Sequence, residues 1–398
     1  MKPSLKAGTC LTYDTQPIDV TGYILRSNLG AKLCSVKRTA AENRSRTLPR
    51  TAVSFALVFP RNEVDLSNIR EVARLAGVSV ATVSRTLKSP ERVLPETRDR
   101  VNVAVEQAGY RPNLMAVQFR SRRTFNLVVL VPNIANGFFA RVISGAQKAA
   151  QAAGYRVLLC DTLGCEATER EFAELVHAHQ ADGLLQLRAY DPFASTSDLS
   201  DVPPIVNACE VLQSGRHPTV SLDNRAAAKA VTQHLLDLGH RRIGLINGPA
   251  DSPLTHDRRA GYEAALREAD IAPDAALICP GDFSLKAGYD GAFQLLAGPE
   301  RPTALFCESD EMAIGALKRI REMGLRVPQD VSLAGFDDIE LAAYCDPPLT
   351  TIAQPAEQFG QQAVEMLISL IEKRPLAARH VTLPYQLTIR QSTARVAG

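Results

Sequence analysis

The first residues suited to chemistry lie on one predicted helix, residues 80–87. The small, hydroxyl and basic side chains expected on its outer face are Ala81, Thr82, Ser84 and Arg85. Small and hydroxyl side chains let a helix lie close in the DNA major groove, where an arginine can donate to guanine and a methyl group can contact thymine. The pattern therefore predicts a surface that reads base pairs. A plain three-helix bundle that binds no nucleic acid is the alternative.

A second set of candidate residues follows predicted strands in the later part of the chain. Asp223 and Asp337 each end or follow a buried run, and Phe138 and Phe139 come after the first strand. Polar and aromatic residues at strand ends are candidates for a ligand cleft, where a carboxylate can accept hydrogen bonds from vicinal hydroxyls and a ring can stack on a ligand ring. The alternatives are a helix N-cap for each carboxylate and core packing for each phenylalanine.

Three short helices are predicted to position the first set. Apolar residues repeat at i, i+3, i+4 and i+7 in the first helix, at Ile69, Val72, Ala73 and Ala76. Gly77 ends this helix and Ser79 caps the second one, so only a tight turn separates them. We expect Val83 and Leu87 to point inward and a third helix to cover residues 95–108. Two helices joined by so short a turn predict a helix-turn-helix.

The chain from about residue 125 alternates β-branched runs with helical segments. The predicted strands are 127–131, 156–160, 183–187, 205–207, 219–222, 243–247, 304–307 and 332–335. The predicted helices are 139–153, 169–179, 225–238, 256–268, 285–296 and 311–323. Continuous apolar strands that alternate with helices predict parallel sheets covered on both faces. Two such runs predict an α/β body of two doubly wound lobes, with a small-molecule site in the cleft between them.

Composition and charge narrow the function classes. Residues 68–123 carry a net charge of +6 and residues 124–398 one of −9, so only the early part is expected to meet a polyanion. The sequence has no long apolar run, no secretory pattern at its start and eight scattered cysteines. These features predict a cytoplasmic protein without a membrane span, disulfide framework or metal site.

No motif for catalysis is found in the sequence. A phosphate-binding loop, a nucleophile elbow and a metal triad are all missing, so no enzyme activity and no cofactor are predicted. Parallel α/β lobes alone do not make an enzyme. A ligand-binding receptor without DNA activity is a further alternative, but the complete helix-turn-helix and the missing secretory pattern argue against it.

The early unit resembles the DNA-binding head of the lactose-repressor (LacI) family. The matching segments are 69–87, 97–101 and 108–113. The resemblance implies base readout by Val80, Ala81 and Arg85, with other residues contacting the DNA backbone or placing the head. The full set of residues expected at the DNA is Ser79, Val80, Ala81, Thr82, Ser84, Arg85, Tyr110, Asn113, Ala116 and Phe119.

Residues 112–124 resemble the hinge helix of the same family. That helix folds on DNA and inserts a leucine into the minor groove, and Phe119 stands at the matching position. A phenylalanine side chain can also insert between base pairs in the minor groove, so the resemblance predicts the same role here. Packing of Phe119 on the body, as a linker anchor, is the alternative.

The body resembles the family along its whole length, for example at 240–249, 301–306, 327–332 and 348–352. The resemblance implies a fold like that of periplasmic sugar-binding proteins, with three crossings between lobes near Asp223, Thr350 and Ala377. It also implies a homodimer on a palindromic operator, with a tetramer left open. Arg258 corresponds to a family ligand arginine and Phe283 to a ligand-stacking aromatic.

Segments 131–133, 252–258 and 345–355 resemble the cytidine-repressor branch of the family. This likeness favours a nucleoside effector such as cytidine over a free sugar. One departure lies before the paired phenylalanines, where Asn136-Gly137 replaces the expected Asp-Pro.

The expected domain organisation has four parts. Residues 1–66 form an extension without a family counterpart, either a disordered arm or the result of a start codon placed too far upstream. Residues 67–111 form the head, 112–124 the hinge and 125–398 the body. Within the body, lobe 1 is expected to comprise 125–223 and 351–377, and lobe 2 to comprise 224–350 and 378–398.

Overall fold

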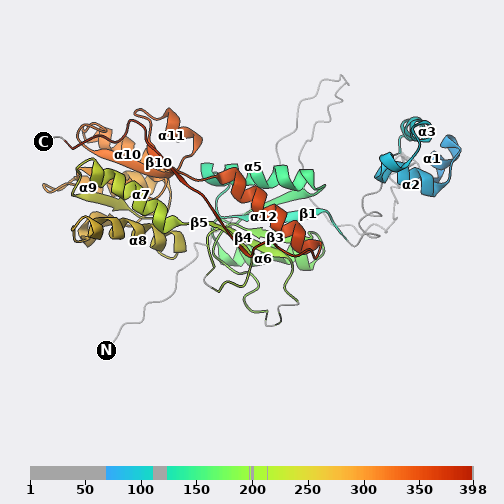
Figure 1. Cartoon of the computed structure of the whole chain (residues 1–398), viewed down its shortest axis with the longest axis horizontal. Helices are drawn as coiled ribbons and strands as arrows, with labels where there is room; N and C mark the ends of the chain where they lie inside the picture. Colours follow the sequence, from blue (N-terminus) through green and yellow to red (C-terminus); the bar gives the residue numbers. More distant parts are fainter. Residues whose placement is uncertain (1–68, 111–122, 197, 199–200, 213, 397–398) are drawn as a thin grey trace, which may run out of the picture. The chain divides into compact units, whose positions relative to one another are not determined.

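The computed structural model describes residues 69–110 and 123–396, apart from 197, 199, 200 and 213 (Figure 1). The predictions for the extension and for Asn113, Ala116 and Phe119 lie outside the described residues. Among the helices that are described, none is long and apolar enough to cross a membrane.

The head consists of three helices that pack around a small core. These are α1 (Ile69–Ala76), α2 (Val80–Lys88) and α3 (Pro95–Gln107), with a short 3₁₀ turn at Pro90–Arg92. The residues that close the core are Val72, Ala73, Ala76, Val83, Val101 and Ala104. The stripe predicted for the first helix therefore faces the interior, and the predicted helix-turn-helix is present.

One prediction for the head is wrong. Leu87 is 37% exposed, whereas Thr86 is buried and donates its hydroxyl to the carbonyl of Thr82 at 2.9 Å. The buried residues of α2 are therefore Val83 and Thr86, which are three positions apart. Thr86 can be buried without an unpaired polar group because its hydroxyl is satisfied within its own helix.

Lobe 1 is built on a six-stranded parallel sheet in the order β11-β5-β4-β3-β1-β2. Its strands are β1 (Asn126–Val131), β2 (Arg156–Asp161), β3 (Gly183–Gln186), β4 (Ile205–Cys209), β5 (Thr219–Leu222) and β11 (His380–Leu383). Helices α5 (Gly137–Ala152) and α12 (Ala356–Ile371) pack together on one face, and α6 (Glu166–His177) covers the other (Figure 1). Alternate residues of β1 are buried on opposite faces, as the predicted continuous apolar strand requires.

Lobe 2 repeats this plan with the sheet order β12-β10-β9-β8-β6-β7. Its strands are β6 (Ile243–Ile246), β7 (Ile278–Cys279), β8 (Ala304–Cys307), β9 (Ser332–Asp337), β10 (Thr350–Ala353) and β12 (Gln386–Thr388). Its helices are α7 (Asn224–Asp237), α8 (Pro253–Glu268), α9 (Leu285–Leu296), α10 (Asp310–Glu322) and α11 (Glu340–Tyr344). The edge strand β12 pairs antiparallel with β10, and the other pairs are parallel. The predicted α/β fold class is confirmed.

Glycines allow the paired helices of each lobe to approach closely. A Cβ atom on Gly360 of α12 would lie 2.0 Å from the carbonyl oxygen of Val142 in α5. In lobe 2, a Cβ atom on Gly288 of α9 would lie 1.9 Å from the carbonyl oxygen of Met312 in α10. Backbone therefore rests on backbone at both crossings, and any side chain would force the helices apart.

The chain crosses between the lobes three times, and two crossings differ from the prediction. The first follows β5 at Asp223, as predicted. The second follows β10, near Gln354, because residues 350–353 still belong to the lobe 2 sheet. The third lies between β11 and β12, near Pro384, and not at Ala377. Residues 378–383 were thus assigned to the wrong lobe, because an edge strand this short has no clear pattern in the sequence.

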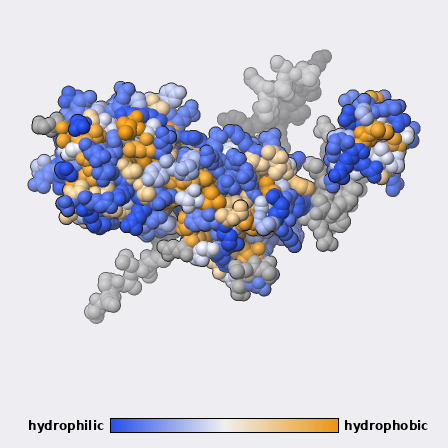
Figure 2. All heavy atoms as spheres, viewed as in Figure 1, coloured by the Kyte–Doolittle hydropathy of each residue, from blue (hydrophilic) through white to orange (hydrophobic). Residues whose placement is uncertain are grey.

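Polar side chains dominate the surface of the lobes seen in Figure 2, with apolar patches between them.

Candidate functional site

The outer face of α2 carries the residues predicted to read DNA. Val80 is 39% exposed, Ala81 and Arg85 are exposed, and Thr82 and Ser84 are half-buried. Tyr110 is half-buried against the core of the head. The structure thus places the candidates of the helix-turn-helix on one accessible surface, whereas Tyr110 is held in the head's own packing.

Ser79 fixes the start of this helix. Its Oγ accepts from the backbone N–H of Thr82 at 3.1 Å and lies 2.9 Å from the Thr82 hydroxyl. An N-cap of this kind typically stabilises a helix by about 1 kcal/mol. The cap also leaves the first backbone N–H groups at the exposed end of α2, where a phosphate would be attracted.

A cavity of about 720 Å³ lies between the two lobes. Five of the six residues predicted for the ligand line it, namely Phe138, Phe139, Arg258, Phe283 and Asp337. Phe138 and Phe139 come from α5 in lobe 1, and Arg258, Phe283 and Asp337 come from lobe 2. A ligand in this cavity would touch both lobes.

Asp223 does not line the cavity. Its Oδ1 accepts from the backbone N–H of Ala226 at 2.8 Å and so caps α7, which is the alternative that the sequence left open. The neighbouring Asn224 is buried instead and accepts from Arg258 Nε at 2.9 Å. At this crossing the cavity is therefore supported by Asn224, through its hydrogen bond to Arg258, and not by the predicted Asp223.

Arg258 lines the cavity and is only 3% exposed. Its Nη1 donates to the carbonyl oxygen of Glu308, and its Cζ lies 3.7 Å from the centre of the Phe336 ring. The carboxyl groups that surround this guanidinium are those of Asp337, Glu308, Glu210 and Asp310. One buried cation therefore compensates several carboxyl groups at once, which is the arrangement that a low-dielectric site requires.

Burial raises the pKa of the carboxyl groups around Arg258. The pKa of Glu308 rises to about 8, and those of Asp337 and Asp310 are also raised by loss of solvent. The positive charge of Arg258 acts in the opposite direction on Glu308 and Asp337. Of these three groups, Asp337 lines the cavity, and a neutral carboxyl group there can donate as well as accept a hydrogen bond.

Four non-glycine lining residues have left-handed backbone conformations, with φ 51° at Leu163, 73° at Cys209, 66° at Phe283 and 118° at Asp337. Such conformations cost about 1–3 kcal/mol each outside glycine and persist where the surroundings fix them. The ring of Phe283 packs against Gly248, because the absent side chain leaves room for it. A Cβ atom on Gly248 would lie 2.2 Å from the ring. Both Phe283 and Asp337 line the cavity from these backbone positions.

Several residues of the site were missed by the sequence analysis. Glu210 lines the cavity, accepts from the N–H of Ala189 at 2.6 Å and accepts from the Ser252 hydroxyl at 2.9 Å. Glu210 directly follows β4 and Glu308 directly follows β8. Both could have been found by the signal that identified Asp337, a carboxylate at the end of a buried strand.

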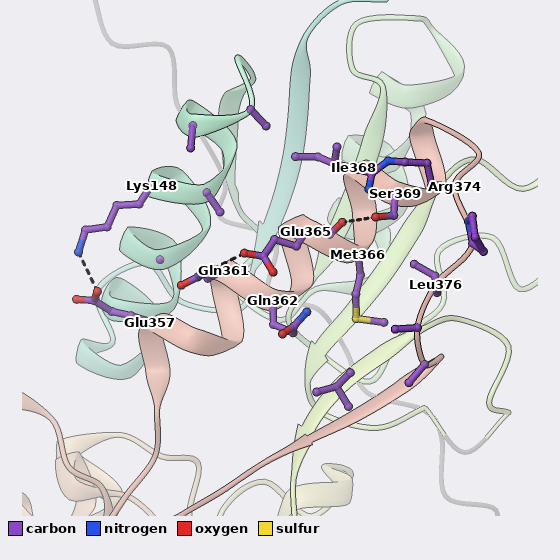
Figure 3. A pocket seen from close by; sticks show the side chains of 18 residues that line it. Lys148, Glu357, Gln361, Gln362, Glu365, Met366, Ile368, Ser369, Arg374 and Leu376 are labelled. Carbon is purple, nitrogen blue, oxygen red and sulfur yellow. Dashed lines mark hydrogen bonds and ion pairs between the residues drawn. The ribbon is translucent and has the colours of Figure 1, made fainter.

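A wider depression of about 920 Å³ lies on lobe 1 between α5, α12 and residues 374–381 (Figure 3). Several of its polar side chains already pair with each other, since Lys148 Nζ lies 2.8 Å from Glu357 and Gln361 Nε2 donates to Glu365 at 2.9 Å (Figure 3). No aromatic ring lines it. The cavity between the lobes is therefore the candidate ligand site.

The described part of the chain holds no group of three or more His, Cys, Asp or Glu side chains that could bind a metal ion.

Comparison with known proteins identifies relatives over most of the chain. Residues 68–113 match bacterial regulatory proteins of the lacI family, and residues 232–393 match the periplasmic binding protein-like domain. The HTH-type transcriptional repressor CytR of Escherichia coli (strain K12) is 40% identical over 328 residues, which cover 82% of this chain and 96% of the relative. The predicted likeness to this repressor is confirmed.

Solved structures agree with these matches. The lac repressor dimer bound to operator and the anti-inducer ONPF has a TM-score of 0.72 and 28% identity, covering 82% of this chain and 99% of that chain. The complex of the transcriptional regulator CelR with cellobiose has a TM-score of 0.63 and 30% identity, with the same coverage. These relatives are regulators of transcription and not enzymes.

Proposed function

We propose that a nucleoside such as cytidine is the effector of this protein. The chain belongs to the lacI family of bacterial regulatory proteins. It is a DNA-binding transcriptional repressor with a ligand-binding body. The observation that carries the proposal is the placement of phenylalanine rings from both lobes in one cavity with Arg258 and Asp337. A base can stack on a ring while the hydroxyls of its ribose bond to carboxylates.

The choice of a nucleoside over a free sugar rests on the number of rings. Phe138 and Phe139 pack edge to face with their centres 5.5 Å apart in lobe 1, and Phe283 extends from lobe 2. Apolar rings on two sides suit a flat heterocycle. A free sugar is the second candidate, because the related CelR binds cellobiose in a structure of the same fold.

Calorimetric titration of the full chain tests the effector. We expect cytidine or adenosine to bind and ribose and cellobiose to bind much more weakly. Phe283→Leu should weaken the nucleoside roughly 2–10-fold through loss of stacking. Phe293→Leu is the matched control, because Phe293 is half-exposed on α9 and does not line the cavity. Tight binding of cellobiose without any nucleoside binding would contradict the proposal.

We propose that α2 enters the major groove as part of a homodimer on a palindromic operator, with Val80, Ala81 and Arg85 contacting bases. Asn113, Ala116 and Phe119 complete the contact from the hinge, 112–124. Effector binding then changes the closure of the two lobes and shifts the population of the folded hinge on DNA. A coupling of about 1–3 kcal/mol would change operator occupancy roughly 5–150-fold.

Arg85→Ala should lower operator affinity by about 1–3 kcal/mol at one base pair in each half-site, because an exposed arginine at this position can pair with guanine. Gel retardation with a set of single-base operator variants measures the effect, and Arg100→Ala, exposed on α3, is the control. If Arg85→Ala weakens all sequences equally, Arg85 contacts a phosphate and the assignment is wrong.

The same gel experiment distinguishes two directions of control. Addition of cytidine should release the operator if the effector is an inducer and should strengthen binding if it is a co-repressor. Either change supports a ligand-controlled repressor.

A further inference from the structure

The first turn of α5 is held by residues of both lobes. Asn136 Oδ1 accepts from the backbone N–H groups of Phe138 and Phe139 at 3.0 and 3.2 Å. The remaining N–H of this turn, that of Gly137, donates to Glu311 Oε1 at 3.1 Å. Glu311 lies in the first turn of α10, in lobe 2. A carboxylate of one lobe therefore satisfies a helix terminus of the other, where negative charge is favourable.

The elements around this contact are themselves fixed. Asp310, next to Glu311, accepts from the N–H of Ile339 at 2.9 Å and from the hydroxyl of Thr351 at 2.6 Å. One helix turn thus ties α10 to β10 and to the segment after β9. On the other side, Arg141 of α5 donates to the carbonyl oxygen of Asp338 at 2.9 Å. The backbone beside Glu311 is therefore fixed within lobe 2, and separation of the lobes would break the hydrogen bond to Gly137.

The contact lies directly beside the ring pair of the cavity. Glu311 and Asn136 line the cavity, and the residues that follow Gly137 on α5 are Phe138 and Phe139. The contacts that hold the first turn of α5 therefore also determine the positions of these two rings.

We propose that Glu311 is a positioning residue for the effector, which clamps the lobes by binding the N–H of Gly137 and so places Phe138 and Phe139 against the ligand. The inference rests on the proposed function for the role of the rings, whereas the clamp itself concerns the lobes alone. It also gives the Asn136-Gly137 departure a physical meaning, because a proline at position 137 would have no N–H to donate.

Position 137 allows this hydrogen bond to be removed without disturbing the fold. Gly137 is the first residue of α5, where proline is favoured, and Asn136 has φ −72° and ψ 128°, which suit a residue before proline. A Cβ atom at Gly137 would meet only Ile339, at an ordinary 3.5 Å. Gly137→Pro therefore removes the donor, and Gly137→Ala retains it with a similar added bulk.

The first measurement compares these two variants by calorimetric titration of the full chain with cytidine. We expect Gly137→Pro to bind cytidine on the order of 10-fold more weakly than Gly137→Ala, as for loss of a hydrogen bond to a charged group. Equal affinities of the two variants for cytidine would overturn the proposal, because only Gly137→Ala retains the backbone N–H at position 137.

The second measurement needs no effector. Hydrogen exchange of the backbone amides of residues 137–139, followed by mass spectrometry, should be on the order of 10-fold faster in Glu311→Ala than in the unsubstituted chain. Glu340→Ala, which removes an exposed acidic residue from the first turn of α11, should leave this exchange unchanged. Unchanged exchange in Glu311→Ala would overturn the clamp.

The two measurements also distinguish failure of the clamp from failure of the proposed function. If the unsubstituted chain binds neither cytidine nor adenosine, the nucleoside proposal fails and hydrogen exchange alone decides the clamp. If cytidine binds and exchange is unaffected by Glu311→Ala, the clamp fails and the nucleoside proposal stands.

Discussion

Arg258→Ala is expected to abolish effector binding and to destabilise the body by about 2–6 kcal/mol, because the buried Asn224 Oδ1 and Glu308 carbonyl oxygen each lose a donor at a cost of about 1–3 kcal/mol. Arg258 is buried and interacts electrostatically with Asp337, Glu308, Glu210 and Asp310. Without it, these carboxyl groups either lose their compensating charge or take up protons. The stacking of the guanidinium on Phe336 is lost as well.

Urea denaturation and calorimetry measure the two parts of this expectation. Arg259→Ala is the matched control, because the adjacent Arg259 lies on the surface and pairs with Glu263, a contact that contributes about 0–1 kcal/mol. Arg258→Lys keeps the charge without the planar fork and should lose affinity while retaining more stability than Arg258→Ala. An Arg258→Ala protein as stable as the Arg259→Ala control would contradict this account of the cavity.

Gly360→Ala is expected to destabilise lobe 1 by about 3 kcal/mol or more, the upper range for forcing an added group into a packed interior. The new Cβ atom would lie 2.0 Å from the carbonyl oxygen of Val142, so α12 and α5 must separate. The obstacle is backbone and not a flexible side chain, so a change of rotamer cannot relieve it.

The free energy of unfolding in urea checks this prediction. Gly298→Ala is the control, because a Cβ atom at Gly298 would meet no atom within 4 Å. Its effect should stay within about 0.5 kcal/mol, as for surface substitutions in general. Equal stability of the two variants would show that the helices can move apart freely.

Most long periodic elements of the fold could be predicted from the sequence, although the 16-residue helix α12 was missed. The predicted helix 285–296 coincides with α9, and β1 and β8 are found where their apolar runs indicated. The short edge strands β11 and β12 were not predicted, because their exposed and half-buried residues lack the apolar continuity of the central strands. Their absence from the prediction is also why the last crossing was misplaced.

The site was predictable only in part. Asp223 and Asp337 gave the same signal, a carboxylate at the end of a strand, yet Asp337 faces the cavity and Asp223 caps a helix. The difference depends on where the chain changes lobe, which local sequence does not contain. Glu311 gave no signal at all, because its partner Gly137 lies 174 residues away.

The late crossing between the lobes has a consequence for how the chain is made. The strands β11 and β12, which complete the edges of both sheets, lie within residues 380–388. During translation, at about 5–20 residues per second, the head can form from its own local contacts tens of seconds before these strands leave the ribosome. Neither lobe can close its sheet until then, so both must wait for the same final segment. A nascent chain therefore presents a finished head while its body is still incomplete, and a premature stop before residue 380 would damage both lobes at once.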